Sequence, residues 1–543
     1  MTNIPTPDEV RENKKKSIED SVVDDGIDGF NLTDTGNAEL IASLYGDKIR
    51  YDHKRGRWLV WGEHRWIPDA DESVKRIAIK CARKRYQQAV EIPDTREREK
   101  VSRWAIQSEG EHKVNATLSM LRALKPIADK GDDWDKKNFL LACKNGVINL
   151  KTGKLRDGKP EDRITMSATI EYIPNAKCPR WELFIREIFA DNEELIKYVH
   201  KALGYTLTGS TCEQVAFFCY GGGRNGKTVL FKTIKNILGD YAYNASAKLF
   251  QGRYSQGAEP EVVATESRRF LVSSETLVTS KINEQRLKTW TGGDSVTARA
   301  LYKEEQTFEP TVKPWLFLNH RPKTEDDSYA FWRRIRSIPF IVKFEGEKED
   351  KNLSEKLELE SKGILTWLVR GCLLWNKESL EDIPQVVRSA TADYQSENDE
   401  LFDYLAANYT EKEDVKALDA FTKYTKWAEE SGVKTKDIMS KTMFGRRMSD
   451  RFEKVRKTDG IYYLNVQNPT YSRHNMYSLP PKNNKPLRES AIGGLCKTTS
   501  NPTTLHKKKV YENTPKGDYL SAKPTQQPLS VTMEEINKDL GHE

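Results

Sequence analysis

The stretch VAFFCYGGGRNGKTVLFKTIKNILGD, residues 215–240, decides the fold of this chain. Residues 215–220 form a continuous apolar run, which is typical of a strand buried at the centre of a sheet. The turn that follows matches the pattern G-x-x-x-x-G-K-[ST] at Gly221, Gly226, Lys227 and Thr228. Behind it, apolar residues recur at helical spacing until Gly239, namely Leu230, Ile234, Ile237 and Leu238. Strand, turn and helix in this order predict an α/β unit that binds a nucleotide.

This glycine-rich turn carries the residue types that phosphate binding requires. Glycine lets backbone N–H groups turn inward around phosphate oxygens, and the positive end of the following helix adds to the attraction. Lys227 supplies a charge for the β- and γ-phosphates, and the Thr228 hydroxyl is a ligand for Mg²⁺. The alternative is a chance glycine-rich turn ahead of a core helix, but strand, turn and helix all agree. We therefore expect ATP or GTP, with Mg²⁺, to bind the whole turn: Gly221, Gly222, Gly223, Arg224, Asn225, Gly226, Lys227 and Thr228.

Two further apolar runs predict strands that end in polar residues. RRFLVSSET, residues 268–276, reaches Glu275, whose carboxylate can support Mg²⁺ or act as a base on the attacking water. KPWLFLNH, residues 313–320, ends in Asn319, whose amide can orient that water. Ligands of open α/β sheets bind at the carboxyl edge of the strands, where both residues are expected. An ordinary surface glutamate and a common loop asparagine are the alternatives.

Arginines cluster in FWRRIRSIPF, residues 331–340, among apolar residues. An arginine fixed on such a packed element can act as a finger that stabilises transition-state charge. We favour Arg333 or Arg334 for this role over Arg336. A solvated basic face or ion pairs with nearby acids is the alternative, and the sequence leaves open whether the finger reaches its own ATP or a neighbour's.

The ordered motifs GGGRNGKT, FLVSSET, LKTWTGGDSVTARALYKEEQTFEP, LFLNHRP and FWRRIRSIPF resemble superfamily 3 helicases of the phage and plasmid primase type. That group includes the poxvirus primase–helicase, and the resemblance covers about residues 137–345. It implies an AAA+-like P-loop ATPase core with a mainly parallel sheet, and a hexameric ring on DNA. It also implies ATP between subunits, a finger acting in trans, and 3′ to 5′ unwinding. The expected role is replication initiator of a phage, plasmid or other mobile element, with host replication proteins as further partners.

The same resemblance implies a DNA-gripping hairpin between Glu275 and Asn319. Its expected arms are residues 296–301 and 308–314, behind a turn at residues 292–294. Residues 302–304 fall near its tip. The motif's basic positions are Lys288, Arg299 and Lys303, and we expect Lys303 to contact a DNA phosphate.

A second DNA-binding region is predicted near the C-terminus. Three helices are expected over residues 399–466, and one of them has the apolar stripe Val415, Leu418, Phe421, Tyr424 and Trp427. The helix after that one places inward Met443, Phe444, Met448 and Phe452, and outward Lys441, Arg446, Arg447 and Arg451. With a β pair behind it, this pattern resembles a winged helix that binds duplex DNA. A solvated helical cap on the motor is the alternative.

Changes in patterning divide the chain into seven segments. We expect a polar arm (1–45), a small α+β domain with a tryptophan-rich hairpin (46–136) and a helical pre-motor domain that opens with two strands (137–212). The motor (213–345), a helical connector (346–398), the winged-helix-like domain (399–480) and a disordered basic tail (481–543) follow.

The composition of the chain limits which classes of protein it can belong to. The 543 residues include 88 Lys or Arg and 81 Asp or Glu. The resulting net charge of +7 does not by itself indicate a nucleic-acid partner. Seven cysteines without metal-ligand spacing argue against a zinc ribbon or a disulfide framework. The sequence shows no apolar signal core and no stretch of membrane-spanning length, so we expect a cytoplasmic protein without a membrane partner.

Two other functions remain open at this point. One is an ATP-regulated origin-binding protein that assembles on duplex DNA without unwinding it. The other is a primase–helicase, although the first 135 or so residues hold no zinc-binding cysteines and no convincing cluster of catalytic acids.

Overall fold

The structure is a computed structural model that describes residues 29–250, 258–273, 282–324, 328–346, 349–433, 435 and 438–467. The expected tail, 481–543, lies outside these residues. Within the described ranges, every helix is too short or too polar to cross a membrane.

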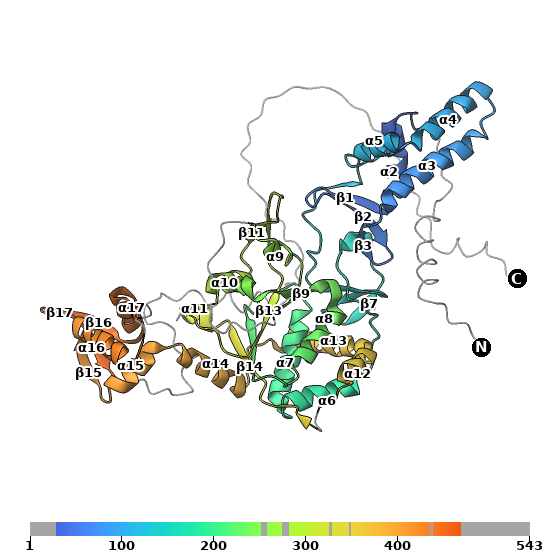
Figure 1. Cartoon of the computed structure of the whole chain (residues 1–543). Coiled ribbons are helices and arrows are strands. Elements are labelled where there is room, and N and C mark those ends of the chain that lie inside the picture. The colour runs from blue at the N-terminus through green and yellow to red at the C-terminus, as the bar shows by residue number, and fades with distance from the viewer. Residues whose placement is uncertain are drawn as a thin grey trace, which may run out of the picture. The chain divides into compact units, whose positions relative to one another are not determined.

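A parallel sheet of five strands organises the segment that was expected to be the motor (Figure 1). Across the sheet the strands are β14 (Ile335–Pro339), β8 (Ala216–Tyr220), β13 (Lys313–Leu318), β10 (Phe270–Ser273) and β9 (Ala242–Ala245). Every neighbouring pair is parallel, which confirms the predicted mainly parallel sheet. From β8 the chain crosses to β9 at the far edge, returns through β10 and β13, and adds β14 on the other side of β8. The winding therefore reverses at β8, and open sheets bind ligands outside the carboxyl ends of strands at such points.

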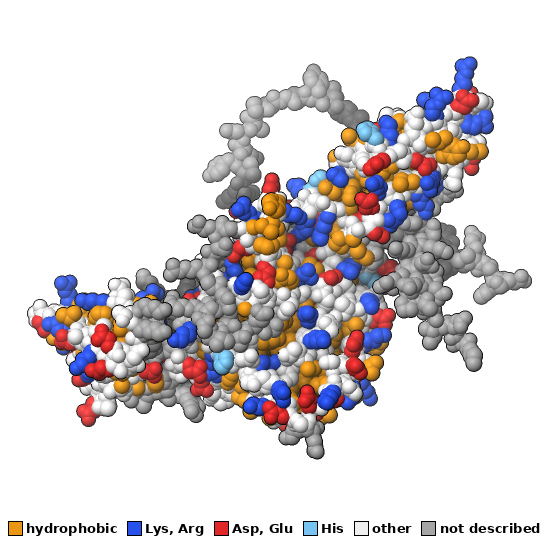
Figure 2. All heavy atoms as spheres, in the orientation of Figure 1, with side chains coloured by type: hydrophobic (Ala, Val, Ile, Leu, Met, Phe, Trp, Pro, Cys, Tyr) orange, Lys and Arg blue, Asp and Glu red, His pale blue; other side chains and the backbone are white. Residues whose placement is uncertain are grey.

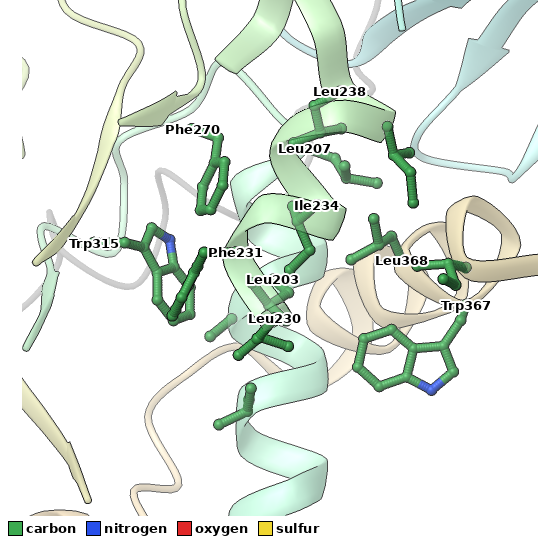
Figure 3. Close-up of a cluster of buried hydrophobic side chains, with 14 of the residues drawn as sticks. Leu203, Leu207, Leu230, Phe231, Ile234, Leu238, Phe270, Trp315, Trp367 and Leu368 are labelled. Atoms are coloured by element: carbon green, nitrogen blue, oxygen red, sulfur yellow. The ribbon is translucent and has the colours of Figure 1, made fainter. Parts of the chain in front are cut away.

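Helix α8 (Lys227–Leu238) lies between this sheet and two long helices, α7 (Glu193–Thr206) and α13 (Ser361–Glu378) (Figure 3). Phe231 of α8 faces the sheet, with its ring centroid 5.5 Å from that of Trp315. On the opposite side, Leu230 lies beside Leu203 of α7 (Figure 3). The apolar positions predicted for α8 are all buried, because the helix has protein on both sides.

One hydrophobic core joins the sheet to helices from both sides of the motor segment. It contains Trp181 of α6 (Pro179–Ile188), Phe217 of β8 and Leu365 of α13. The helices expected as a pre-motor domain and as a connector therefore share their core with the motor strands. Further helices of this part are α9 (Pro260–Val263), α10 (Glu284–Gly292), α11 (Tyr329–Trp332), α12 (Leu353–Leu359) and α14 (Gln385–Glu397).

The segment before α6 holds three antiparallel strands instead of the expected two. They are β5 (Leu140–Cys143), β6 (Gly146–Asn149) and β7 (Lys154–Arg156). The prediction was wrong because both glycine turns, at Gly146 and Gly153, reverse the chain and so separate three strands.

The small N-terminal domain combines a four-stranded sheet with helices. Its elements are α2 (Asp34–Tyr45), β1 (Ile49–Asp52), β2 (Arg57–Gly62), β3 (Arg65–Pro68), α3 (Ser73–Ala89), α4 (Thr95–Ser108), α5 (Glu111–Leu121) and β4 (Ala128–Asp129). The end of the expected polar arm is helix α2, which buries Ile41 and Tyr45 in the domain core. Trp66 of the predicted hairpin is buried against Trp134, with ring centroids 5.7 Å apart.

The hairpin predicted between Glu275 and Asn319 is present, but its two strands are shorter than the predicted arms. β11 (Val296–Arg299) pairs antiparallel with β12 (Glu305–Phe308), and Val296 lies opposite Phe308. The expected second arm, 308–314, was therefore placed too late, because the residues after Phe308 lead into β13.

The C-terminal part has one more strand than predicted. Its elements are α15 (Glu400–Asn408), β15 (Glu413–Lys416), α16 (Ala417–Glu430), α17 (Lys441–Arg451), β16 (Glu453–Lys457) and β17 (Gly460–Val466). β15 pairs with β17 and completes a three-stranded antiparallel sheet. Phe444 and Met448 are buried as expected, but Leu418 and Met443 are 52% and 41% exposed. Those two inward predictions were wrong because neither side chain falls on the buried stripe of its helix.

Candidate active site

Two glycines of the turn at residues 221–228, which is predicted to bind phosphate, have a backbone conformation that favours glycine. Gly223 and Gly226 have φ of +82° and +80°. A Cβ on Gly226 would lie 2.5 Å from Cγ2 of Ile188 in α6, so the turn is pressed against that helix. At Gly222 and Gly223 a Cβ would meet nothing within 4 Å, so this part of the turn is open to a ligand.

Lys227 is held over the turn. Its Nζ donates to the carbonyl oxygen of Gly221 at 2.6 Å and lies 5.9 Å from the ring centroid of Phe340. The residue is only 6% exposed, and burial lowers the pKa of its ammonium group. An anionic phosphate beside Nζ would offset that desolvation, because it favours the charged form. Thr228 is exposed in the first turn of α8, where its hydroxyl suits a hydrated Mg²⁺.

The turn is also anchored to the chain that follows β14. Asn225 is buried, and its Nδ2 donates to the carbonyl oxygen of Phe340 at 3.2 Å. The backbone N–H of Phe344 donates to the carbonyl oxygen of Arg224 at 2.8 Å. Asn225 and Arg224, both expected to bind ATP, thus also fix the shape of the loop.

Asn319 lies at the same edge of the sheet as the turn. Leu318, the last residue of β13, is paired with Tyr220, and its carbonyl oxygen accepts from the N–H of Gly221 at 3.2 Å. Asn319 comes next and is exposed. Glu275 lies outside the described residues, two positions beyond the end of β10. Among the described residues, no three His, Cys, Asp or Glu side chains gather as a metal site.

The three arginines lie at the other edge of the sheet. β14 begins at Ile335, which is paired with Ala216 at the start of β8, and Arg333 and Arg334 precede it. The length of β8, about 15 Å at about 3.3 Å per residue, therefore separates them from the turn. Arg333 donates to Oε1 of Gln214, and Arg334 donates to the carbonyl oxygen of Ala330. Arg336 donates to the carbonyl oxygen of Arg333 at 2.7 Å.

The expected DNA-binding residues of the hairpin lie on its outer side. Arg299 and Lys303 are exposed, while Val296 and Ala298 of the same hairpin are buried. At the tip, Tyr302 is fully exposed, and Figure 2 shows hydrophobic side chains along the projecting hairpin. Lys288 lies in α10, away from the tip, and its Nζ donates to Oγ of Ser328 at 3.3 Å.

In the C-terminal part, three of the four expected basic residues are accessible on α17. Lys441 and Arg446 are exposed, and Arg447 is partly exposed. Arg451 was expected to point outward, but its Nη2 donates to Oδ2 of the buried Asp399 at 2.6 Å. That prediction failed because its partner is remote in sequence.

Sequence reasoning passed over Arg321, which stands two positions after Asn319. Its guanidinium lies 4.2 Å from the ring centroid of Tyr220, the residue just before the turn. The position of Arg321 inside the motif LFLNHRP was the available signal.

Comparison with known families covers most of the described chain. Residues 38–190 match the family described as D5 N terminal like, and residues 396–480 match the family described as Poxvirus D5 protein-like. The chain is therefore similar to D5-type proteins over both of these parts. Residues 219–334 also match a family of unknown function, DUF5906.

Several proteins similar to this chain come from large DNA viruses. A protein of Acanthamoeba polyphaga mimivirus named as a candidate helicase is 26% identical over 468 residues, which cover 78% of this chain and 48% of that protein. A candidate helicase of Frog virus 3 is 25% identical over 383 residues, with 55% and 39% covered. The chain thus spans less than half the length of these curated relatives. The C-terminal region of NrS-1 superposes with a TM-score of 0.43 at 12% identity, covering 80% of this chain and 99% of that chain.

Proposed function

We propose that this chain hydrolyses ATP, with Mg²⁺, and uses the energy to move along and unwind DNA as a hexameric ring. The proposed polarity is 3′ to 5′, and the proposed role is initiation of replication for a phage, plasmid or other mobile element, with host replication proteins as partners. The observation that carries the proposal is the division of the site between two edges of one sheet. The phosphate-binding turn and Asn319 share the carboxyl edge, and Arg333 and Arg334 lie at the amino edge.

In this mechanism the turn holds the phosphates of ATP and Lys227 neutralises their charge. Asn319 orients the attacking water, and Glu275 supports Mg²⁺ or accepts the proton. Mg²⁺, bound through Thr228, would supply further positive charge at the phosphates when present. Because Arg333 and Arg334 lie far from the turn of their own chain, they act on ATP held by a neighbouring subunit. A head-to-tail ring supplies such a neighbour for every site.

Movement of DNA is assigned to the β11–β12 hairpin. Exposed Arg299 and Lys303 would contact phosphates, and a single strand can also stack on an exposed aromatic side chain such as Tyr302. The C-terminal part, with a basic helix α17 followed by the β16–β17 hairpin, is proposed as a winged-helix domain on duplex DNA. The parallel sheet with its turn after β8 supports the assignment of an AAA+-like P-loop core.

A strand-displacement assay on forked DNA tests the proposal. Wild type should displace a strand when ATP is present, and Lys227→Ala should abolish both hydrolysis and displacement while duplex binding remains. Lys232→Ala is the matched control, because this exposed lysine lies on the same helix beyond the turn. Wild type that hydrolyses ATP on DNA yet displaces no strand would instead support the origin-binding alternative. Ribonucleotide incorporation on a single-stranded template would support the primase–helicase alternative.

A further inference from the structure

The loop after β13 connects the carboxyl edge of the sheet, where the proposed nucleotide site lies and which is called the nucleotide edge below, to helix α14 outside that site. This loop, residues 319–324, begins at Asn319. The guanidinium of Arg321 covers the ring of Tyr220, the last residue of β8, at 4.2 Å from its centroid. Gly221 is the next residue along the chain, so Arg321 packs directly against the entry to the phosphate-binding turn.

The same loop is fastened to the end of α14. Arg321 donates through Nη1 to Oε1 of Glu397 at 2.5 Å and through Nη2 to the carbonyl oxygen of Ala390 at 3.3 Å. The hydroxyl of Tyr394 donates to the carbonyl oxygen of Pro322 at 2.7 Å. The side chain of Arg321 is 13% exposed, so its charge is largely withdrawn from water and depends on these partners.

The end of α14 leads without a linker into the C-terminal part. The backbone N–H of Thr324 donates to Oδ1 of Asn398, the residue that follows α14, at 3.1 Å. The next residue, Asp399, caps α15 by accepting from the N–H of Phe402 at 3.1 Å. Asp399 also accepts from Arg451 at the end of α17. A continuous set of contacts therefore runs from the nucleotide edge to the basic helix α17.

A second branch of the loop reaches the helix that precedes the β11–β12 hairpin. The hydroxyl of Thr324 donates to Oε1 of Glu284, in the first turn of α10. The N–H of Ile282 donates to the carbonyl oxygen of Lys323 at 3.2 Å. Both regions proposed to bind DNA are thus attached to one short loop that starts at Asn319.

We propose that Arg321 is a positioning residue that couples the nucleotide state of the turn to the C-terminal DNA-binding part through Glu397 and Asp399. This inference rests on the proposed function. A rearrangement of the turn on nucleotide binding moves Tyr220 or Asn319. Because Arg321 contacts Tyr220 and is hydrogen-bonded to α14, α14 shifts with it. A nucleotide can shift α17 only if it favours one arrangement of this connection over another.

Hydrogen exchange of the α17 amides, with and without the non-hydrolysable analogue adenylyl imidodiphosphate, tests the coupling. In wild type the analogue should change exchange in α17, and in Arg321→Ala this change should be lost while the analogue still binds within about twofold of wild-type affinity. DNA should also stimulate hydrolysis by the variant about fivefold less than by wild type, since coupling between sites is typically fivefold or more. Arg388→Ala, an exposed arginine on the same helix α14, should behave as wild type.

A conservative change separates coupling from loss of folding. Arg321→Lys keeps a cation beside Tyr220 and a donor for Glu397, so it should retain most of the exchange response that Arg321→Ala loses. The inference is overturned if wild-type α17 does not respond to the analogue, if Arg321→Ala responds fully, or if Arg321→Lys is folded and loses as much of the response as Arg321→Ala. Failure of the proposed function looks different, because wild type would then hydrolyse no ATP although the exchange response to the analogue could still be measured.

Discussion

Two separate constraints require glycine at position 226: the backbone conformation and the lack of space for a side chain. Its φ of +80° is strained for any residue with a Cβ, and the space beside it is filled by Ile188 and Phe184 of α6. We expect Gly226→Ala to lower the free energy of unfolding by about 1–3 kcal/mol and to abolish ATP binding, because the turn can no longer keep its shape.

Gly222→Ala is the matched control in the same turn. A Cβ there meets nothing within 4 Å, so stability should change little. Chemical denaturation and titration with a fluorescent ATP analogue measure the two effects. Equal losses in both variants would show that the contact with α6 does not shape the turn.

The place of a residue in the fold could be predicted where a short motif contains the whole reason for that residue. Lys227 and Thr228 could be placed from eight letters of sequence, because strand, turn and helix follow one another directly. The pairing of Arg451 with Asp399 could not, because the two residues stand 52 positions apart and meet only after three helices have packed. Gln214, the partner of Arg333, gives no local signal either.

At the scale of elements, α7 and α13 form a pair whose contact contains a titratable group. His200 of α7 stacks on Trp367 of α13 with ring centroids 3.8 Å apart, and its Nε2 lies 2.7 Å from the carbonyl oxygen of Trp367. Burial lowers the pKa of His200 to about 4. The folded protein therefore holds this ring neutral, whereas the unfolded chain takes up a proton near pH 6.5.

A pH dependence of stability follows. Because the folded pKa is the lower one, the stabilising contribution is complete above about pH 6.5 and is lost as the pH falls towards 4. Over this pH range the free energy of unfolding of wild type should fall by about 3 kcal/mol more than that of His200→Gln, whose side chain cannot titrate. Chemical denaturation at a series of pH values measures both. A variant that loses stability in parallel with wild type would mean that other groups account for the acid sensitivity.

Elements were predicted well where burial imposes a pattern and poorly where it does not. The strands β8, β10 and β13 are apolar runs because the sheet buries both of their faces. β15 reads EDVK and has no apolar alternation, so nothing in its sequence distinguishes it from a loop. It is a strand because β17 offers it a free edge.

At the scale of the whole molecule, shifts in composition do not mark the limits of the hydrophobic cores. The core around α8 takes residues from Leu141 to Val387, so three of the predicted segments pack as one unit. Local patterning cannot show this, because it reports which face of a helix is apolar but not which element covers that face.

The separation of the arginines from the turn leads to a prediction about the assembly. In the proposed ring, each site combines Lys227 from one subunit with Arg333 or Arg334 from the next, so Arg333→Ala and Lys227→Ala should each be nearly inactive alone. Loss of a finger arginine lowers hydrolysis by about 10³-fold or more. Mixed in equal amounts under conditions of subunit exchange, the two variants should recover about a quarter of wild-type hydrolysis, because a random head-to-tail ring forms intact sites at that frequency. Lys227→Ala mixed with the double variant Lys227→Ala/Arg333→Ala is the control and should recover nothing. If the first mixture also stays inactive, and the same holds with Arg334→Ala, the sites are not shared between subunits.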